Sequence, residues 1–203
     1  SPAGQLARLK MIEEGYDSSK GITDVLTWVF GSNERIEILH ELCEYLTQND
    51  VLIAVCSRGR PAVIRHLLGK AVSERTKKSL LSYLTGGIYG RAYQGYPASK
   101  LDKKSEGRIP AEDANFTSWR RKAEVLAGML GRASLTANKL LFIDDDAREI
   151  QDIRESIEGV NTHLVSRPQG SVNAGGIQSQ AYQRGERGDI PAIKATMKAI
   201  LNS

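Results

Sequence analysis

Apolar residues recur with helical spacing in several parts of the chain. The clearest case runs from Asn33 to Gln48, where Ile36, Leu39, Leu42, Cys43 and Leu46 form one stripe. Ser32 or Asn33 is a suitable N-cap for this helix. The same kind of spacing predicts further helices over residues 5–14, 61–68, 73–84, 118–129, 147–157 and 191–201.

Short runs dominated by apolar and β-branched residues predict strands. Three of them, 51–55, 139–143 and 159–165, lie between the predicted helices, and the first two are apolar on both faces, as in the interior of a parallel sheet. A fourth short strand is predicted at 86–90, while 24–30 is ambiguous between helix and strand. Helices that alternate with such strands predict an α/β fold, a Rossmann-like parallel sheet flanked by helices.

Composition narrows the class of protein but does not name a function. The 203 residues fit a single domain, 1–203, and 40% hydrophobic with 26% charged residues is typical of a globular protein. A net charge of +4 is too small to indicate nucleic acid. Cys43 and Cys56 are too few for a disulfide framework. With no apolar stretch of about 20 residues and no signal-peptide pattern near Ser1, we expect an intracellular, soluble and most simply cytoplasmic protein without a membrane partner.

The carboxyl ends of the predicted strands carry the candidate chemistry, because ligands of parallel α/β sheets bind there. Asp144, Asp145 and Asp146 follow the strand at 139–143. Adjacent carboxylates repel one another, and Mg²⁺ would remove that repulsion while using only one or two of them with water and phosphate oxygens. The alternative is that these acids only cap the next helix. Both can hold, with Asp144 and Asp145 as metal ligands and Asp146 as the cap.

Two further positions gain meaning from their place in the chain. Ser57 follows the strand at 51–55, and its hydroxyl, with the backbone N–H groups of Arg58 and Gly59, is suited to binding a phosphate; Arg60 would add positive charge. The alternative is a plain N-cap serine. Lys122 lies near the start of the helix before the aspartate strand and would neutralise phosphate and carboxylate charge, although most lysines at such positions are solvated surface groups.

Taken together, these motifs resemble the haloacid dehalogenase (HAD) superfamily of phosphohydrolases. Ser57, Lys122 and the segment Phe142-Ile143-Asp144-Asp145-Asp146 match its second, third and fourth motifs in order and spacing, over residues 30–167. The resemblance implies that Ser57 hydrogen-bonds the transferring phosphoryl group, that Lys122 stabilises it together with the nucleophile, and that Asp144 and Asp145 hold Mg²⁺. The substrate would be a phosphate monoester of unknown class, hydrolysed through an aspartyl-phosphate.

The first motif of this superfamily, an apolar strand that ends in Asp-x-Asp and supplies the nucleophile, has no match in the first 50 residues. Three explanations stay open. The nucleophile lies upstream of this chain, so that residues 1–32 form the flap or cap that follows it, with a possible insertion at 86–117 and a mobile loop at 170–188. Alternatively, residues 21–30 fill the strand position without a nucleophile, which makes a pseudoenzyme. Or the resemblance is false, and the chain is an unrelated α/β binding domain.

The alternative function is a catalytically inactive HAD-like module that binds a protein or nucleic acid. Nucleic acid is possible but not indicated. Its basic contacts would be Lys103, Lys104, Arg120, Arg121, Lys122, Arg184 and Arg187, with Tyr83, Tyr89, Tyr93 and Tyr96 as stacking groups. Core and cap packing is the simpler explanation for the tyrosines. The histidines share no metal-ligand spacing, and His40, between apolar residues on its helix, is interpreted as structural.

Overall fold

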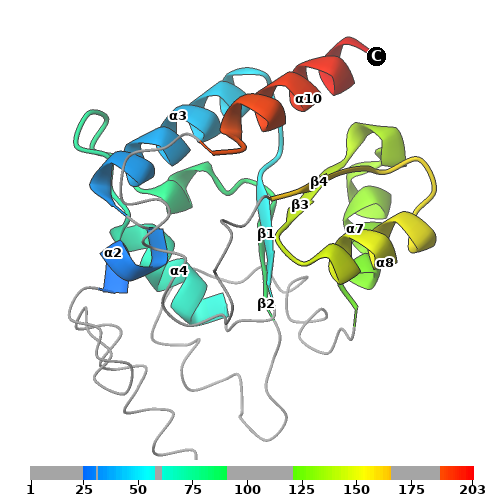
Figure 1. The fold of residues 1–203 in the computed structure, drawn as a ribbon, viewed down its shortest axis with the longest axis horizontal. Helices are drawn as coiled ribbons and strands as arrows, with labels where there is room; N and C mark the ends of the chain where they lie inside the picture. The colour runs from blue at the N-terminus through cyan, green and yellow to red at the C-terminus, as the bar shows by residue number, and fades with distance from the viewer. Residues whose placement is uncertain (1–24, 31, 58–60, 91–120, 166–187) are drawn as a thin grey trace, which may run out of the picture. The chain divides into compact units, whose positions relative to one another are not determined.

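A computed structural model describes residues 25–30, 32–57, 61–90, 121–165 and 188–203 (Figure 1). Its contacts divide the chain into two compact units. Unit 1 contains the described residues up to 90, and unit 2 contains 121–165 and 188–203. Both combine helices with short parallel strands, so the mixed α/β class expected from the sequence is confirmed. None of the described helices is long and apolar enough to cross a bilayer.

Unit 1 packs helices against one pair of parallel strands. Strands β1 (Ala54–Ser57) and β2 (Gly87–Gly90) pair in parallel, with Ser57 opposite Gly90. The helical elements are α2 (Val25–Phe30), α3 (Asn33–Gln48), α4 (Pro61–Lys70) and the 3₁₀ turn η2 (Leu80–Tyr83). The ambiguous segment at 24–30 is therefore helical from Val25 onward.

Helix α3 begins and ends where its apolar stripe predicts. The Ser32 hydroxyl accepts a hydrogen bond from the Arg35 backbone N–H at 3.1 Å, which confirms the expected N-cap. Ile36 belongs to a small core with Ala71 and Leu80, which Leu39 and Cys43 border. Burial raises the pKa of the Cys43 thiol to about 11, so this cysteine stays a neutral core residue.

The first strand begins three residues later than predicted. Val51 N–H still bonds to Leu46 at the end of α3, and the ladder starts only where Gly86 N–H reaches Ile53 O at 2.9 Å. The chains approach closely there: a Cβ on Gly86 would lie 3.1 Å from the Ile53 carbonyl oxygen, which is why glycine is needed. Leu52 lies outside the strand and is 57% exposed, so the prediction of a run buried on both faces is wrong at this residue.

The helix predicted over 73–84 is also wrong for most of its length. Only Leu80–Tyr83 forms a short 3₁₀ turn, while the preceding residues form a hydrogen-bonded turn. Ser73 N–H bonds to Lys78 O, and the Ser73 hydroxyl accepts from Thr76 N–H. Lys77 adopts the left-handed region with φ of 59°. A serine side chain that bonds local backbone groups competes with helix formation, and residues 73–79 accordingly form a turn instead of a helix.

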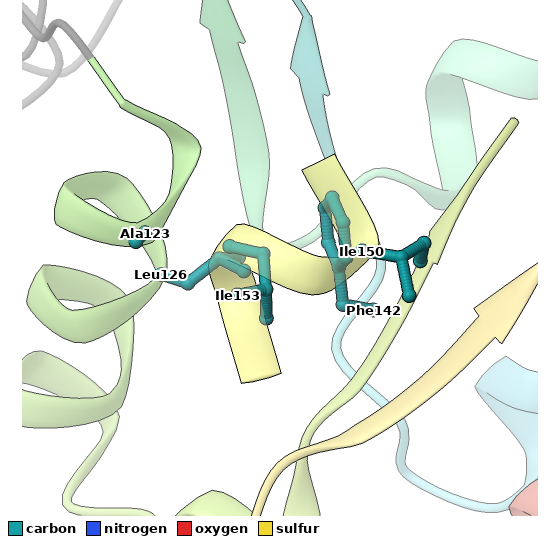
Figure 2. Packing of buried hydrophobic residues seen from close by; sticks show 5 residues of the cluster. All are labelled: Ala123, Leu126, Phe142, Ile150 and Ile153. Carbon is teal, nitrogen blue, oxygen red and sulfur yellow. The ribbon is translucent and has the colours of Figure 1, made fainter. Parts of the chain in front are cut away.

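Unit 2 contains strands β3 (Leu141–Asp144) and β4 (Asn161–Leu164), paired in parallel. Its helices are α7 (Lys122–Ala133), α8 (Ala147–Ser156) and α10 (Ile190–Asn202), with the 3₁₀ turn η3 (Ala137–Lys139) before β3. Ala123 and Leu126 of α7, Phe142 of β3, and Ile150 and Ile153 of α8 form its core (Figure 2). Helices α7 and α8 therefore pack with β3 through one apolar cluster.

Two boundaries in unit 2 differ from the prediction. Lys139 lies in η3, so the strand begins at Leu141 and includes Asp144. Ile143 is 38% exposed, so β3 is not buried on both faces among the described residues. Helix α7 begins at Lys122 with Arg121 at the N-cap position; the start predicted at residue 118 lies outside the described residues.

Several predicted segments cannot be compared with the fold. The possible insertion at 86–117 overlaps β2 at its start and otherwise lies outside the described residues after Gly90. The mobile loop at 170–188 and the flap or cap at 1–32 also fall mainly outside them. The prediction of a single domain over 1–203 stays a prediction.

Candidate active site at the carboxyl end of β3

The three consecutive aspartates have different surroundings. Asp144 is the last residue of β3, and Asp146 is the N-cap of α8. The Asp146 carboxylate accepts a hydrogen bond from Arg148 N–H at 2.9 Å, so the expected capping role is confirmed. Asp145, between them, is exposed. The sequence therefore places one acid at the strand end, one at the surface and one at the helix start.

Lys122 and Asp144 form a buried ion pair. The Lys122 ammonium donates to Asp144 Oδ2 at 2.5 Å, and each side chain is only 9% exposed. Lys122 is in the first turn of α7 and Asp144 is at the end of β3, so the pair joins two elements that are 22 residues apart in sequence. The structure thus brings together two residues that the sequence analysis selected independently.

Further contacts fix this ion pair on both sides. Asp144 Oδ1 accepts the backbone N–H of Asp146 at 2.9 Å, so each carboxylate oxygen has a donor. The Lys122 ammonium also lies 5.8 Å from the centre of the Phe142 ring, within the range of a cation–π interaction. Phe142 and Asp144 are two residues apart on β3 and face the same side, which is the side of the α7–α8 core.

Arg121 anchors the start of α7 to α8. Its guanidinium forms an ion pair with Asp152 and donates to the Ser156 hydroxyl at 2.7 Å. The hydrogen bond to Asp152, with the charge of that residue, raises the pKa of Arg121 above its ordinary value. From the sequence, Arg121 was predicted only to belong to a basic cluster. Its partner Asp152 is 31 residues later in the sequence and could not be predicted, because the pairing depends on how α7 and α8 pack.

The donor set at the end of β3 is compatible with Mg²⁺. A carboxylate oxygen has two lone pairs, so Asp144 retains acceptor capacity beyond its bonds to Lys122 and Asp146. Mg²⁺ typically uses one or two carboxylates and fills its remaining positions with water and phosphate oxygens. No cluster of three or more metal-ligating side chains occurs among the described residues. A magnesium site at Asp144 and Asp145 therefore stays a prediction.

The other predicted phosphate-binding residues belong to unit 1 or lie outside the described residues. Ser57 is half-buried at the carboxyl end of β1, as predicted. Arg58, Gly59 and Arg60 lie outside the described residues. The expectation that Ser57 shares one crevice with Lys122 and Asp144 stays a prediction.

Unit 1 has a buried polar network that the sequence did not indicate. His40 is fully buried, and its Nε2 donates to the Ala71 carbonyl at 3.1 Å. Its Nδ1 lies 3.5 Å from the Tyr83 hydroxyl, which is 3.5 Å from Glu44. Nearby, Ser73 donates to Glu37 at 2.7 Å. The spacing of Glu37, His40 and Glu44 on α3 shows that they share one face, but only the fold provides their partners.

Two tyrosines considered for base stacking are buried. Tyr83 and Tyr89 are core residues of unit 1, and burial raises the pKa of Tyr83. Arg121 and Lys122 of the basic cluster both form ion pairs with carboxylates within unit 2. Tyr93, Tyr96, Lys103, Lys104, Arg120, Arg184 and Arg187 lie outside the described residues.

No protein-family model, curated protein or solved structure matches this chain.

Proposed function

We propose that this chain contributes the phosphate- and metal-binding part of an HAD-like, Mg²⁺-dependent phosphohydrolase. The buried ion pair between Lys122 and Asp144 carries the proposal. Replacing such a pair by apolar residues of similar volume is often neutral or stabilising, so stability alone gives little reason to keep it. Its position at the carboxyl end of a parallel strand, where α/β proteins bind ligands, favours a functional role.

Each residue of the site would act on the charge of a phosphate monoester. Asp144 and Asp145 would hold the metal ion. Lys122 would neutralise the phosphoryl oxygens. A hydrogen bond from Ser57, a residue of unit 1, to the phosphoryl group stays what the resemblance implies. Bound Mg²⁺ would supply electrostatic stabilisation of the phosphoryl group. The acceptor of the phosphoryl group would be an aspartate of the first motif, which is not among the three motifs matched in this chain.

The register of β3 supports an additional strand beside it. Asn161 N–H bonds to Leu140 O and Val165 N–H to Asp144 O, so the even-numbered residues of β3 direct their backbone groups toward β4. The N–H and C=O groups of Leu141 and Ile143 therefore point to the opposite edge. No strand among the described residues pairs with that edge, and two-stranded sheets are seldom stable alone.

Of the three open explanations for the absent first motif, the fold bears on the second. Residues 25–30 are helical, so most of the segment considered as a strand without a nucleophile does not have that conformation. We propose that the nucleophile belongs to a strand other than residues 25–30. The inactive-module alternative gains no support from Tyr83, Tyr89 or the pair Arg121–Lys122, because all four are engaged inside the units.

Calorimetric titration of Mg²⁺ tests the proposal. We expect saturable binding to the wild type and loss of binding in Asp144→Asn. Asp152→Asn is the matched control, because it removes an aspartate that pairs with Arg121 in the same unit. Equal binding to all three proteins would exclude Asp144 as a ligand. Robust Mg²⁺-dependent turnover of an aryl phosphate by this chain would instead contradict our placement of the nucleophile.

A further inference from the structure

We propose that the Lys122 ammonium acts as a tethered cation that competes with Mg²⁺ for Asp144, so that metal binding releases Lys122 from the carboxylate. This inference rests on the proposed function, since it concerns the same site. It begins from the contact of 2.5 Å between Lys122 Nζ and Asp144 Oδ2. Both side chains are 9% exposed, so little water is present to screen an approaching second cation.

The geometry leaves no position on Asp144 that is remote from the ammonium. Oδ2 binds Lys122, and Oδ1 accepts the Asp146 N–H at 2.9 Å. A divalent ion that binds either oxygen of this carboxylate is therefore close to the ammonium. Two cations this close repel each other strongly in a poorly hydrated site. Either the ammonium moves away, or the metal binds weakly.

Lys122 has the means to move while its helix stays in place. Its flexible four-carbon side chain lies in the first turn of α7, whose neighbouring residues Ala123 and Leu126 are fixed in the core. The Arg121 contacts with Asp152 and Ser156 also hold the start of this helix. Movement would thus be confined to the lysine side chain. Once released, the ammonium is free to pair with a phosphate anion, so the metal would bind first and the anion second.

The test compares Mg²⁺ affinity in two lysine variants by calorimetry. Lys122→Met removes the competing charge, and we expect it to bind Mg²⁺ about tenfold or more tightly than the wild type. Lys198→Met removes the same charge from an exposed position on α10 and controls for net charge; its affinity should equal that of the wild type. Unchanged or weaker binding by Lys122→Met would overturn the competition.

A second measurement titrates the wild type, in case Lys122→Met does not fold. Mg²⁺ is titrated while the side-chain ¹³Cε resonance of Lys122 is followed by NMR, with assignment from its absence in Lys122→Arg. We expect this resonance to move in proportion to metal occupancy, while that of Lys198 stays fixed. Metal binding that requires Asp144 but leaves Lys122 unmoved would overturn the inference and leave the proposed function standing. No metal binding to any of these proteins would overturn both.

Discussion

Both units bury polar side chains, but they do so for different reasons. In unit 1, His40 and Glu37 of α3 bond to the Ala71 carbonyl and the Ser73 hydroxyl, which are 31 and 36 residues away in the sequence. In unit 2, Lys122 and Asp144 are two full charges between elements that already share an apolar core. Unit 1 therefore adds hydrogen bonds beside the apolar cluster of Ile36, Ala71 and Leu80. In unit 2 the pair adds charge where packing is already complete.

The largest expected effect comes from breaking the pair in unit 2. Lys122→Met leaves Asp144 buried without its counter-charge, and we expect the free energy of unfolding to fall by about 3–5 kcal/mol. Urea denaturation monitored by circular dichroism measures it. The double variant Lys122→Met with Asp144→Leu should recover most of the loss, because it removes both charges. A single-variant loss below about 1 kcal/mol would show that water already solvates the pair.

The corresponding change in unit 1 should cost less. His40→Leu fills a similar volume and removes one of two donors to the Ala71 carbonyl, which keeps the Leu80 N–H, so we expect a loss of about 0.5–1.5 kcal/mol. Tyr83→Phe is the sharper control. It keeps the bond from His40 to Ala71 and removes only a hydroxyl whose two contacts are both 3.5 Å long. If Tyr83→Phe destabilises the protein as much as His40→Leu, the hydroxyl and not the carbonyl is the critical partner.

The comparison also shows what the sequence could and could not predict. Helix α3 was predictable residue by residue, since its stripe and its serine cap are local signals. The strand ends were not, because β1 begins only where β2 provides a partner opposite Ala54. The helix predicted over 73–84 failed for most of its length because Ser73 bonds both the local backbone and Glu37, and Glu37 is 36 residues away.

The candidate site was predictable in its residue types more than in its contacts. A lysine before the strand and aspartates after it are visible in the sequence, and so is the cap at Asp146. That Lys122 and Asp144 form a closed pair, supported by Phe142, follows only from packing α7 against β3. Long-range ion pairs such as Arg121–Asp152 have no sequence signature at all.

Each unit has a helix whose N-cap side chain accepts a backbone N–H, and the two caps can be compared. Ser32→Ala in unit 1 and Asp146→Ala in unit 2 each remove one side-chain bond to a helix N–H, and we expect a loss of about 1 kcal/mol in either case. Urea denaturation again measures both. The backbone N–H of Asp146, which the alanine variant keeps, donates to Asp144. A much larger loss for Asp146→Ala would indicate that the Asp146 side chain also supports the neighbouring ion pair by positioning this N–H.

The smallest expected effect is a pH dependence in unit 1. Burial would raise the pKa of Glu37, but hydrogen bonds from Ser73 and from the Glu74 N–H outweigh it and hold the pKa below the ordinary value of 4.5. A carboxyl with a lowered folded-state pKa contributes stability that is complete above its unfolded-state pKa and is lost as pH falls through the folded-state value.

Glu37→Gln should thus lower the free energy of unfolding at pH 6 by at most about 1 kcal/mol, because the site is partly solvated. The gap to the wild type should close as the pH falls below 4.5. Urea denaturation between pH 6 and pH 3 measures this, with Glu158→Gln, an exposed carboxylate in unit 2, as the control that should show a constant gap. A gap for Glu37→Gln that stays constant across this range would mean that the two hydrogen bonds hold the neutral carboxyl as well as the carboxylate.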